Sequence, residues 1–192
     1  MHFIGMVAYR TPTRMEFNLF LTLASLLAVM VFAAAGLAVA SRPTGDPFGN
    51  TVKGGVLTGA GVVIMHYTGM AAIHTNSRME WDTSIVGLSV LIAVVVSVVG
   101  LWLATNVKTA GRQALAALVM GVAVCGMHYT GMSAGTMICT GRTYAPTLFA
   151  VEGENIGYAV FALAAVVLIF IFVIEATRSA TQAATASSGT RP

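Results

Sequence analysis

Residues 54–77 read GGVLTGAGVVIMHYTGMAAIHTNS and contain no charged side chain. Within them, the six residues Met65–Met70 (MHYTGM) recur unchanged at Met127–Met132 and, with two substitutions, at Met1–Met6 (MHFIGM). The chain therefore repeats one histidine motif three times in apolar surroundings. Because a polar side chain at membrane depth is energetically unfavourable, its repetition indicates function more than chance.

The composition indicates an integral membrane protein. Hydrophobic residues make up 57% of the 192 residues, charged residues 9%, and the mean hydropathy is +0.83. A soluble domain carries about a quarter charged residues, so we expect the lipid bilayer to be the main partner of the chain. The net charge of +3 is spread over the ends of the apolar stretches and forms no basic cluster, which argues against nucleic acid as a partner.

The apolar stretches predict an all-α membrane protein. Each is long enough to supply the roughly 20 residues that cross a bilayer as a helix, whereas the segment before Tyr9 is too short. We therefore predict a bundle of five complete transmembrane helices plus one partial N-terminal helix. The five predicted spans lie within residues 17–42, 54–78, 83–107, 113–141 and 155–174.

The three motifs predict a repeated architecture in which a motif helix is followed by a plain helix. The predicted pairs are 1–40, 54–107 and 113–174. Three motif helices that point the same way would be parallel repeats about an axis along the membrane normal.

The domain boundaries follow from composition. Residues 1–178 are predicted to form one membrane domain, and residues 179–192, rich in Ala, Thr and Ser, a disordered cytoplasmic tail. A helix beginning at membrane depth would leave backbone N–H groups unsatisfied, so we expect the domain to be N-terminally incomplete, with natural residues upstream of Met1.

The distribution of basic residues predicts the orientation. The loops that follow the motifs hold four basic residues, and the opposite loops with the tail hold six. The positive-inside rule then places the second set and the C-terminus in the cytoplasm. The motifs would lie in the outer half of the membrane.

The motif itself predicts a metal site. Residues i and i+4 share a helix face, so His66 and Met70 are neighbours, and the same holds in the other two copies. Imidazole and thioether together suit copper, and soft thioethers favour Cu(I); no carboxylate lies near a motif. The candidate ligands are Met1, His2, Met6, Met65, His66, Met70, Met127, His128 and Met132.

Two further side chains could continue the helix faces that carry these motif residues. His74 lies eight residues after His66, and we weigh a ligand and a surface residue equally for it. Cys125 precedes His128 by one helical turn and is interpreted as a small apolar residue rather than a thiolate ligand. Tyr67 and Tyr129 fit either the lining of the site or the membrane interface.

The remaining motif features are interpreted as packing. Gly55 with Gly59, and Gly131 with Gly135, form small-xxx-small pairs of the kind that pack membrane helices. Residues 14–17 (RMEF) and 78–81 (RMEW) are interpreted as interfacial anchors with an aromatic ring at headgroup level.

The three copies of the motif, with their flanking Gly-Met, resemble the MHYT sensor domain of bacteria over nearly the whole chain. The resemblance implies a multi-pass sensor of the bacterial cytoplasmic (inner) membrane, typically of seven helices, with the motifs near the outer face. It implies oxygen, carbon monoxide or nitric oxide as the signal, bound through copper held by the Met and His residues named above. Since no output domain follows here, a separate cytoplasmic signalling protein, or the rest of a longer chain, would carry the signal onward.

Four functions remain open on the sequence. The favoured one is a non-enzymatic sensor. A copper or proton transport protein would need polar groups along the whole span, and the inner halves of the motif helices are almost wholly apolar apart from Thr58. A membrane protein whose motifs only pack helices is a third interpretation. A copper redox enzyme would need a substrate pocket and an electron route, and the sequence indicates neither.

Overall fold

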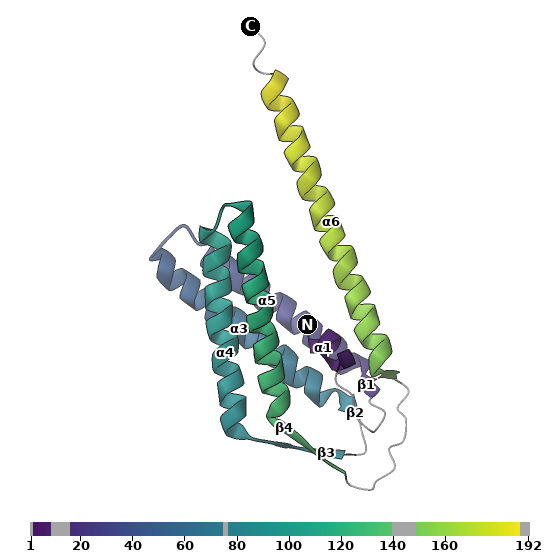
Figure 1. Ribbon diagram of the computed structural model, residues 1–192. Coiled ribbons are helices and arrows are strands. Elements are labelled where there is room, and N and C mark those ends of the chain that lie inside the picture. The colour runs from purple at the N-terminus through teal and green to yellow at the C-terminus, as the bar shows by residue number, and fades with distance from the viewer. Residues whose placement is uncertain (1, 9–15, 75–76, 140–148, 189–192) are drawn as a thin grey trace.

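The computed structural model describes residues 2–8, 16–74, 77–139 and 149–188. Five long helices and one short N-terminal helix make up most of the described chain (Figure 1). The predicted all-α membrane bundle is therefore confirmed. The helices are α1 (His2–Ala8), α2 (Leu19–Ala40), α3 (Pro47–Ala71), α4 (Thr83–Asn106), α5 (Ala110–Ser133) and α6 (Gly153–Ser188).

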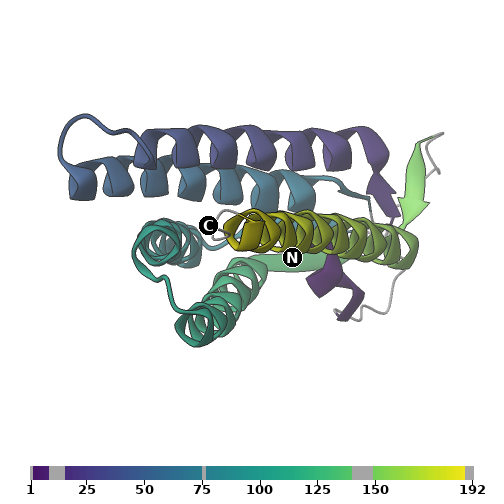
Figure 2. The same cartoon turned by 90° about the horizontal axis from the view of Figure 1, so that it is seen from above.

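The helices follow the predicted repeat of motif helix and plain helix. Motif helices α1, α3 and α5 are followed by α2, α4 and α6. Along the bundle α2 packs on α3, α3 on α4 and α4 on α5, whereas α6 packs mainly on α1 (Figure 2). Helix α6 projects beyond the other helices at one end of the molecule (Figure 1).

The helix starts are set by short polar side chains. The Asp46 carboxylate accepts hydrogen bonds from the backbone N–H groups of Phe48 and Gly49 at the start of α3. The Asp82 carboxylate does the same for Ser84 and Ile85 at the start of α4. Such caps satisfy N–H groups that have no partner inside the helix.

Four of the long helices, α2, α4, α5 and the Asn155–Thr181 part of α6, are long and apolar enough to cross a membrane. Helix α3 has sufficient length but is not one of these four; it packs between α2 and α4 and carries glycines and polar residues on its buried faces. The predicted packing role of the Gly55–Gly59 pair is confirmed. A Cβ atom at Gly55 would lie 2.5 Å, and one at Gly59 2.8 Å, from Cα atoms of α4.

Short strands join the ends of the helices at the motif end of the bundle, which the sequence did not predict. One sheet has the order β2–β1–β5 and the other pairs β3 with β4, all antiparallel. The strands therefore tie together segments from all three repeats. They are β1 (Glu16–Asn18), β2 (Ile73–His74), β3 (Ser77–Trp81), β4 (Gly135–Cys139) and β5 (Ala150–Glu152).

The structure corrects several details of the sequence analysis. Helix α5 ends at Ser133 and Gly135 begins β4, so the prediction that Gly131 and Gly135 pack as a helical pair is wrong. Phe17 is 1% exposed and belongs to the protein core, so its assignment as an interfacial anchor is also wrong. At the other end of the chain, α6 continues to Ser188 through most of the segment predicted to be a disordered tail.

Candidate metal centre

The three motif histidines come together at the centre of the motif end. His2 lies on α1, His66 on α3 and His128 on α5. The ring centroids of the three pairs are 4.9, 5.3 and 5.4 Å apart, and the ring planes meet at 82°, 75° and 87°. The imidazoles thus form a nearly equilateral triangle of mutually edge-on rings.

The three imidazoles are closed off from solvent and have no hydrogen-bond partner among the described residues. Their exposed fractions are 0%, 0% and 1% for His2, His66 and His128. All six ring nitrogen atoms are buried, and none makes a hydrogen bond of good geometry, although backbone groups of Gly69 and Gly131 lie near the rings of His2 and His66. Because burying an unsatisfied polar group costs about 1–3 kcal/mol, three such rings in one place indicate a site built to hold something else.

The donor set fits a metal ion. One nitrogen from each ring lies within 4.8 Å of the other two. Metal–nitrogen bonds of about 2.0 Å to three nitrogens in a plane would separate those nitrogens by about 3.5 Å, a gap that small ring rotations can close. No carboxylate belongs to the group, which is the donor chemistry of a soft or borderline ion rather than of Mg²⁺ or Ca²⁺.

A methionine lies one helical turn beyond each histidine, about 6 Å along the helix axis at 1.5 Å per residue. These residues, Met6, Met70 and Met132, are 3–5% exposed and belong to one apolar cluster. The buried thioethers thus form a layer next to the imidazole layer. The cluster also contains Phe3, Phe17, Ala72 and Ile156.

The other predicted methionine ligands are placed less uniformly. Met127 is 2% exposed, whereas Met65 is only partly buried. Met1 lies outside the described residues. That the nine predicted side chains bind metal stays a prediction; the structure brings three of them, the histidines, within reach of one ion.

Neither His74 nor Cys125 joins the three histidines. Helix α3 ends at Ala71, so His74 lies in β2 and does not continue the helical stripe. Cys125 is a free, exposed cysteine on α5. The exposed Cys125 agrees with its interpretation as a residue other than a ligand, and His74, which the sequence left open, lies outside the group of three histidines. The spacing of His74 from His66 would place it on the same helix face only if the helix continued.

The two tyrosines of the motif have different surroundings. The Tyr67 hydroxyl is hydrogen-bonded to the hydroxyl of Ser89 on α4 at 2.6 Å, and its ring lies between those of His66 and Trp81, with centroids 5.0 and 5.4 Å away. Tyr129 is 54% exposed. The sequence analysis missed Ser89; its one signal is a hydroxyl in an apolar span.

Comparison with known proteins agrees with the repeats. The chain matches the family described as "Bacterial signalling protein N terminal repeat" (MHYT) over residues 1–48, 59–117 and 121–186. These three segments correspond to the three pairs of motif and plain helix. No solved structure matches the chain.

Several curated proteins are related to the chain. It is 41% identical over 70% of its length to the bifunctional diguanylate cyclase/cyclic di-GMP phosphodiesterase MucR of Pseudomonas aeruginosa. It is 37% identical over 71% of its length to an uncharacterized signaling protein of Caulobacter vibrioides, and 28% identical over 91% to the signaling protein YkoW of Bacillus subtilis. The matches span 20%, 17% and 22% of these relatives.

The family match covers most of the chain, with one motif histidine in each matched segment. The apolar helices agree with a multi-pass membrane protein. The chain belongs to the MHYT family of bacterial signalling proteins, a family of membrane-type sensors.

Proposed function

We propose that this chain is a non-enzymatic sensor that detects a diatomic gas (oxygen, carbon monoxide or nitric oxide) or the redox state through copper held by its motifs. The imidazoles of His2, His66 and His128 would hold the ion, and the neighbouring thioethers would complete a soft environment. We place the sensor in the bacterial inner membrane, with the motifs towards the outer face and the C-terminus in the cytoplasm.

The observation that supports this proposal best is the group of three buried imidazoles without hydrogen-bond partners among the described residues. Rings that served only to pack helices would be replaced at no loss by apolar side chains. Imidazole with thioether favours copper, and Cu(I) in particular, over Zn²⁺. When bound, Cu(I) would supply an ion able to take up small diatomic ligands; the surrounding apolar cluster excludes water.

A signal also needs a route away from the site. Helix α1, which carries His2, packs on α6, and β5 at the start of α6 pairs with β1. A change in the position of α1 would therefore reach α6, whose other end projects beyond the bundle (Figure 1). We propose that α6 passes the change to a cytoplasmic signalling protein or to a further part of a longer chain. This requires two packing states with different ligand affinity.

Transport of copper or protons is less well supported. Thr58 is the polar residue expected to mark a path through the inner half of α3. Its hydroxyl donates to the backbone carbonyl of Gly54 at 2.9 Å, one turn back in the same helix. The side chain is thus used within its own helix.

The test is the copper content of the detergent-purified protein, measured per chain by elemental analysis. We expect about one copper in the wild type and none in the His66→Ala/His128→Ala double variant. His74→Ala is the matched control, because it removes a histidine outside the group of three, and it should keep the copper. Full copper in the double variant would refute the proposed site.

The gas step is tested on copper-loaded protein. Carbon monoxide added to the reduced wild type should give an infrared stretching band that is absent from the double variant. A wild type that binds copper but gives no response to carbon monoxide, nitric oxide or oxygen would limit the function to redox sensing.

A further inference from the structure

Each motif carries a glycine three residues after its histidine, so that the shared pattern is His-x-x-Gly. In all three motifs, this glycine faces the imidazole of a different motif. Real Cβ atoms essentially never come within 3.0 Å of a heavy atom from elsewhere in the chain, and a Cβ atom at each of these glycines would do so. A Cβ atom would lie 2.6 Å from the His2 Nε2 at Gly69 and 2.5 Å from the His128 Nε2 at Gly5, and at Gly131 it would overlap the His66 Nε2.

The three contacts form a closed cycle with one direction. The histidine of the first motif lies against the glycine of the second, that of the second against the glycine of the third, and that of the third against the glycine of the first. Every motif therefore contributes one imidazole and receives another. Proximity of the three helices would not by itself require this regular exchange.

The three rings are closely surrounded. Each is at most 1% exposed and lies edge-on against the other two. A methyl group at one of these glycines would have to push an imidazole out of the triangle or force two helices apart. Overpacking of a closed core is destabilising, and a displaced ring would also lose its place relative to the other two.

We propose that Gly5, Gly69 and Gly131 are positioning residues of the histidine site, each fixing the imidazole that a different repeat contributes. The glycine and the histidine of one motif thus act on different rings. The cycle is a property of the protein without metal. Only its effect on copper affinity rests on the function proposed above.

The first experiment compares two glycines of helix α5. Gly131 faces His66, whereas Gly126 has open space around its Cβ position. We expect Gly131→Ala to lower the apparent melting temperature of the metal-free protein in detergent by about 2–10 °C. Gly126→Ala should leave it unchanged or raise it slightly, since alanine favours helix. Equal effects of the two substitutions would overturn the proposal.

The second experiment tests the pairing. Removing the facing ring should relieve the clash, so Gly131→Ala should have little further effect in a His66→Ala background. It should keep its full effect in a His2→Ala background, because His2 faces Gly69 instead. If Gly131→Ala alone fails to accumulate, recovery of folded protein in the His66→Ala background gives the same readout. Equal loss in both backgrounds would refute the cycle.

Copper affinity separates this proposal from the proposed function. Displacing one imidazole should weaken copper binding about 10- to 100-fold in Gly131→Ala and leave Gly126→Ala like the wild type. Pairing-specific relief in a protein that binds no copper would support the cycle and refute the copper sensor. Copper binding in the wild type, with equal effects of Gly131→Ala in the His66→Ala and His2→Ala backgrounds, would support the copper sensor and refute the cycle.

Discussion

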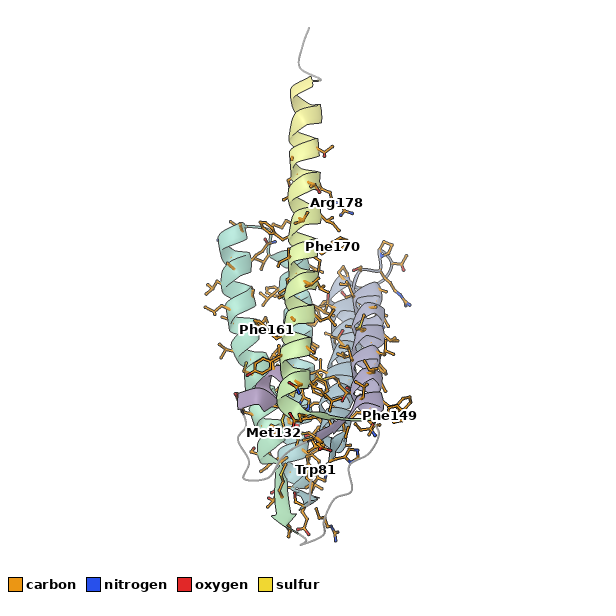
Figure 3. All side chains as sticks on the ribbon, turned by 90° about the vertical axis from the view of Figure 1, so that its right-hand side faces the viewer. Trp81, Met132, Phe149, Phe161, Phe170 and Arg178 are labelled. Atoms are coloured by element: carbon orange, nitrogen blue, oxygen red, sulfur yellow. The ribbon has the colours of Figure 1, made fainter. Side chains whose placement is uncertain are left out.

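The motif end of the bundle and its opposite end bury different kinds of side chain. At the motif end, around Met132 and Trp81, imidazoles, thioethers and Phe17 are enclosed by three helices and two small sheets (Figure 3). Towards the end near Arg178, large apolar side chains such as Phe170 are more than 60% exposed (Figure 3). The buried imidazoles, thioethers and aromatic rings are therefore concentrated at one end. The other end packs through small residues such as Gly54 and Gly55 and presents apolar surface suited to lipid.

This difference has a physical reason. In a bilayer, apolar side chains gain little by leaving lipid for the protein interior, because lipid tails are as apolar as leucine. Polar and close-packed groups must find protein partners instead. The following substitutions compare the stability lost at buried groups of the motif end with the stability lost at exposed or equivalent positions, from the largest expected effect to the smallest.

The largest effect is expected for Phe17→Ala. The Phe17 ring is 1% exposed and packs edge-on against Phe3 at 5.7 Å, so truncation should destabilise the protein by about 3–5 kcal/mol. Phe170→Ala, which removes a ring that is 64% exposed and lies towards the opposite end (Figure 3), should have almost no effect. Detergent-based unfolding curves measure both. Similar losses would mean that the two environments differ less than their burial indicates.

The next effect concerns the metal. Copper at about 100 times its dissociation constant should stabilise the wild type by about 2.7 kcal/mol. His66→Leu should abolish this gain and leave the metal-free protein at least as stable, because two unsatisfied buried nitrogens are removed. Melting temperatures with and without copper test the prediction. A metal-free variant as unstable as Phe17→Ala would show that the imidazole is needed for packing.

The helix caps provide a control for this comparison, because each cap should contribute the same stability at the two ends. Asp46 caps α3 at the opposite end and Asp82 caps α4 at the motif end, and both are exposed. Alanine at either position should destabilise the protein by about 1 kcal/mol. Chemical denaturation of the two variants should give matching losses. A much larger loss at Asp82 would indicate that helix ends, and not only buried side chains, contribute to the difference.

The smallest effect is expected for the motif tyrosines. Tyr67→Phe removes the hydrogen bond to Ser89, for which membrane proteins show on average about 0.6 kcal/mol. Tyr129→Phe, at an exposed ring, should be neutral. The measurement is the free energy of unfolding of each variant. Equal losses for Tyr129→Phe and Tyr67→Phe would show that the hydrogen bond of Tyr67 does not distinguish it from the exposed Tyr129.

The sequence predicted the membrane class, the long helices and the three repeats, because length, charge and composition are local properties of a helix that must cross lipid. It also marked His2, His66 and His128 as a set. It left His74 open between a ligand and a surface residue, since helical spacing cannot show that α3 ends at Ala71. Its interpretation of Cys125 as a residue other than a ligand agrees with the exposed position of that side chain. The sheets pair segments that are far apart along the chain, such as Glu16 with His74 and with Glu152, and no local pattern marks such pairing.

The sequence by itself therefore determined what each repeat contains: an apolar helix with a histidine, a methionine one turn later and a glycine between them. Only the tertiary structure decided how these parts meet. It brought three imidazoles from segments more than 60 residues apart into one solvent-free triangle and set each against the glycine of another repeat. The periodicity of a helix fixes neighbours within one element, whereas contacts between elements depend on how their surfaces fit when they pack.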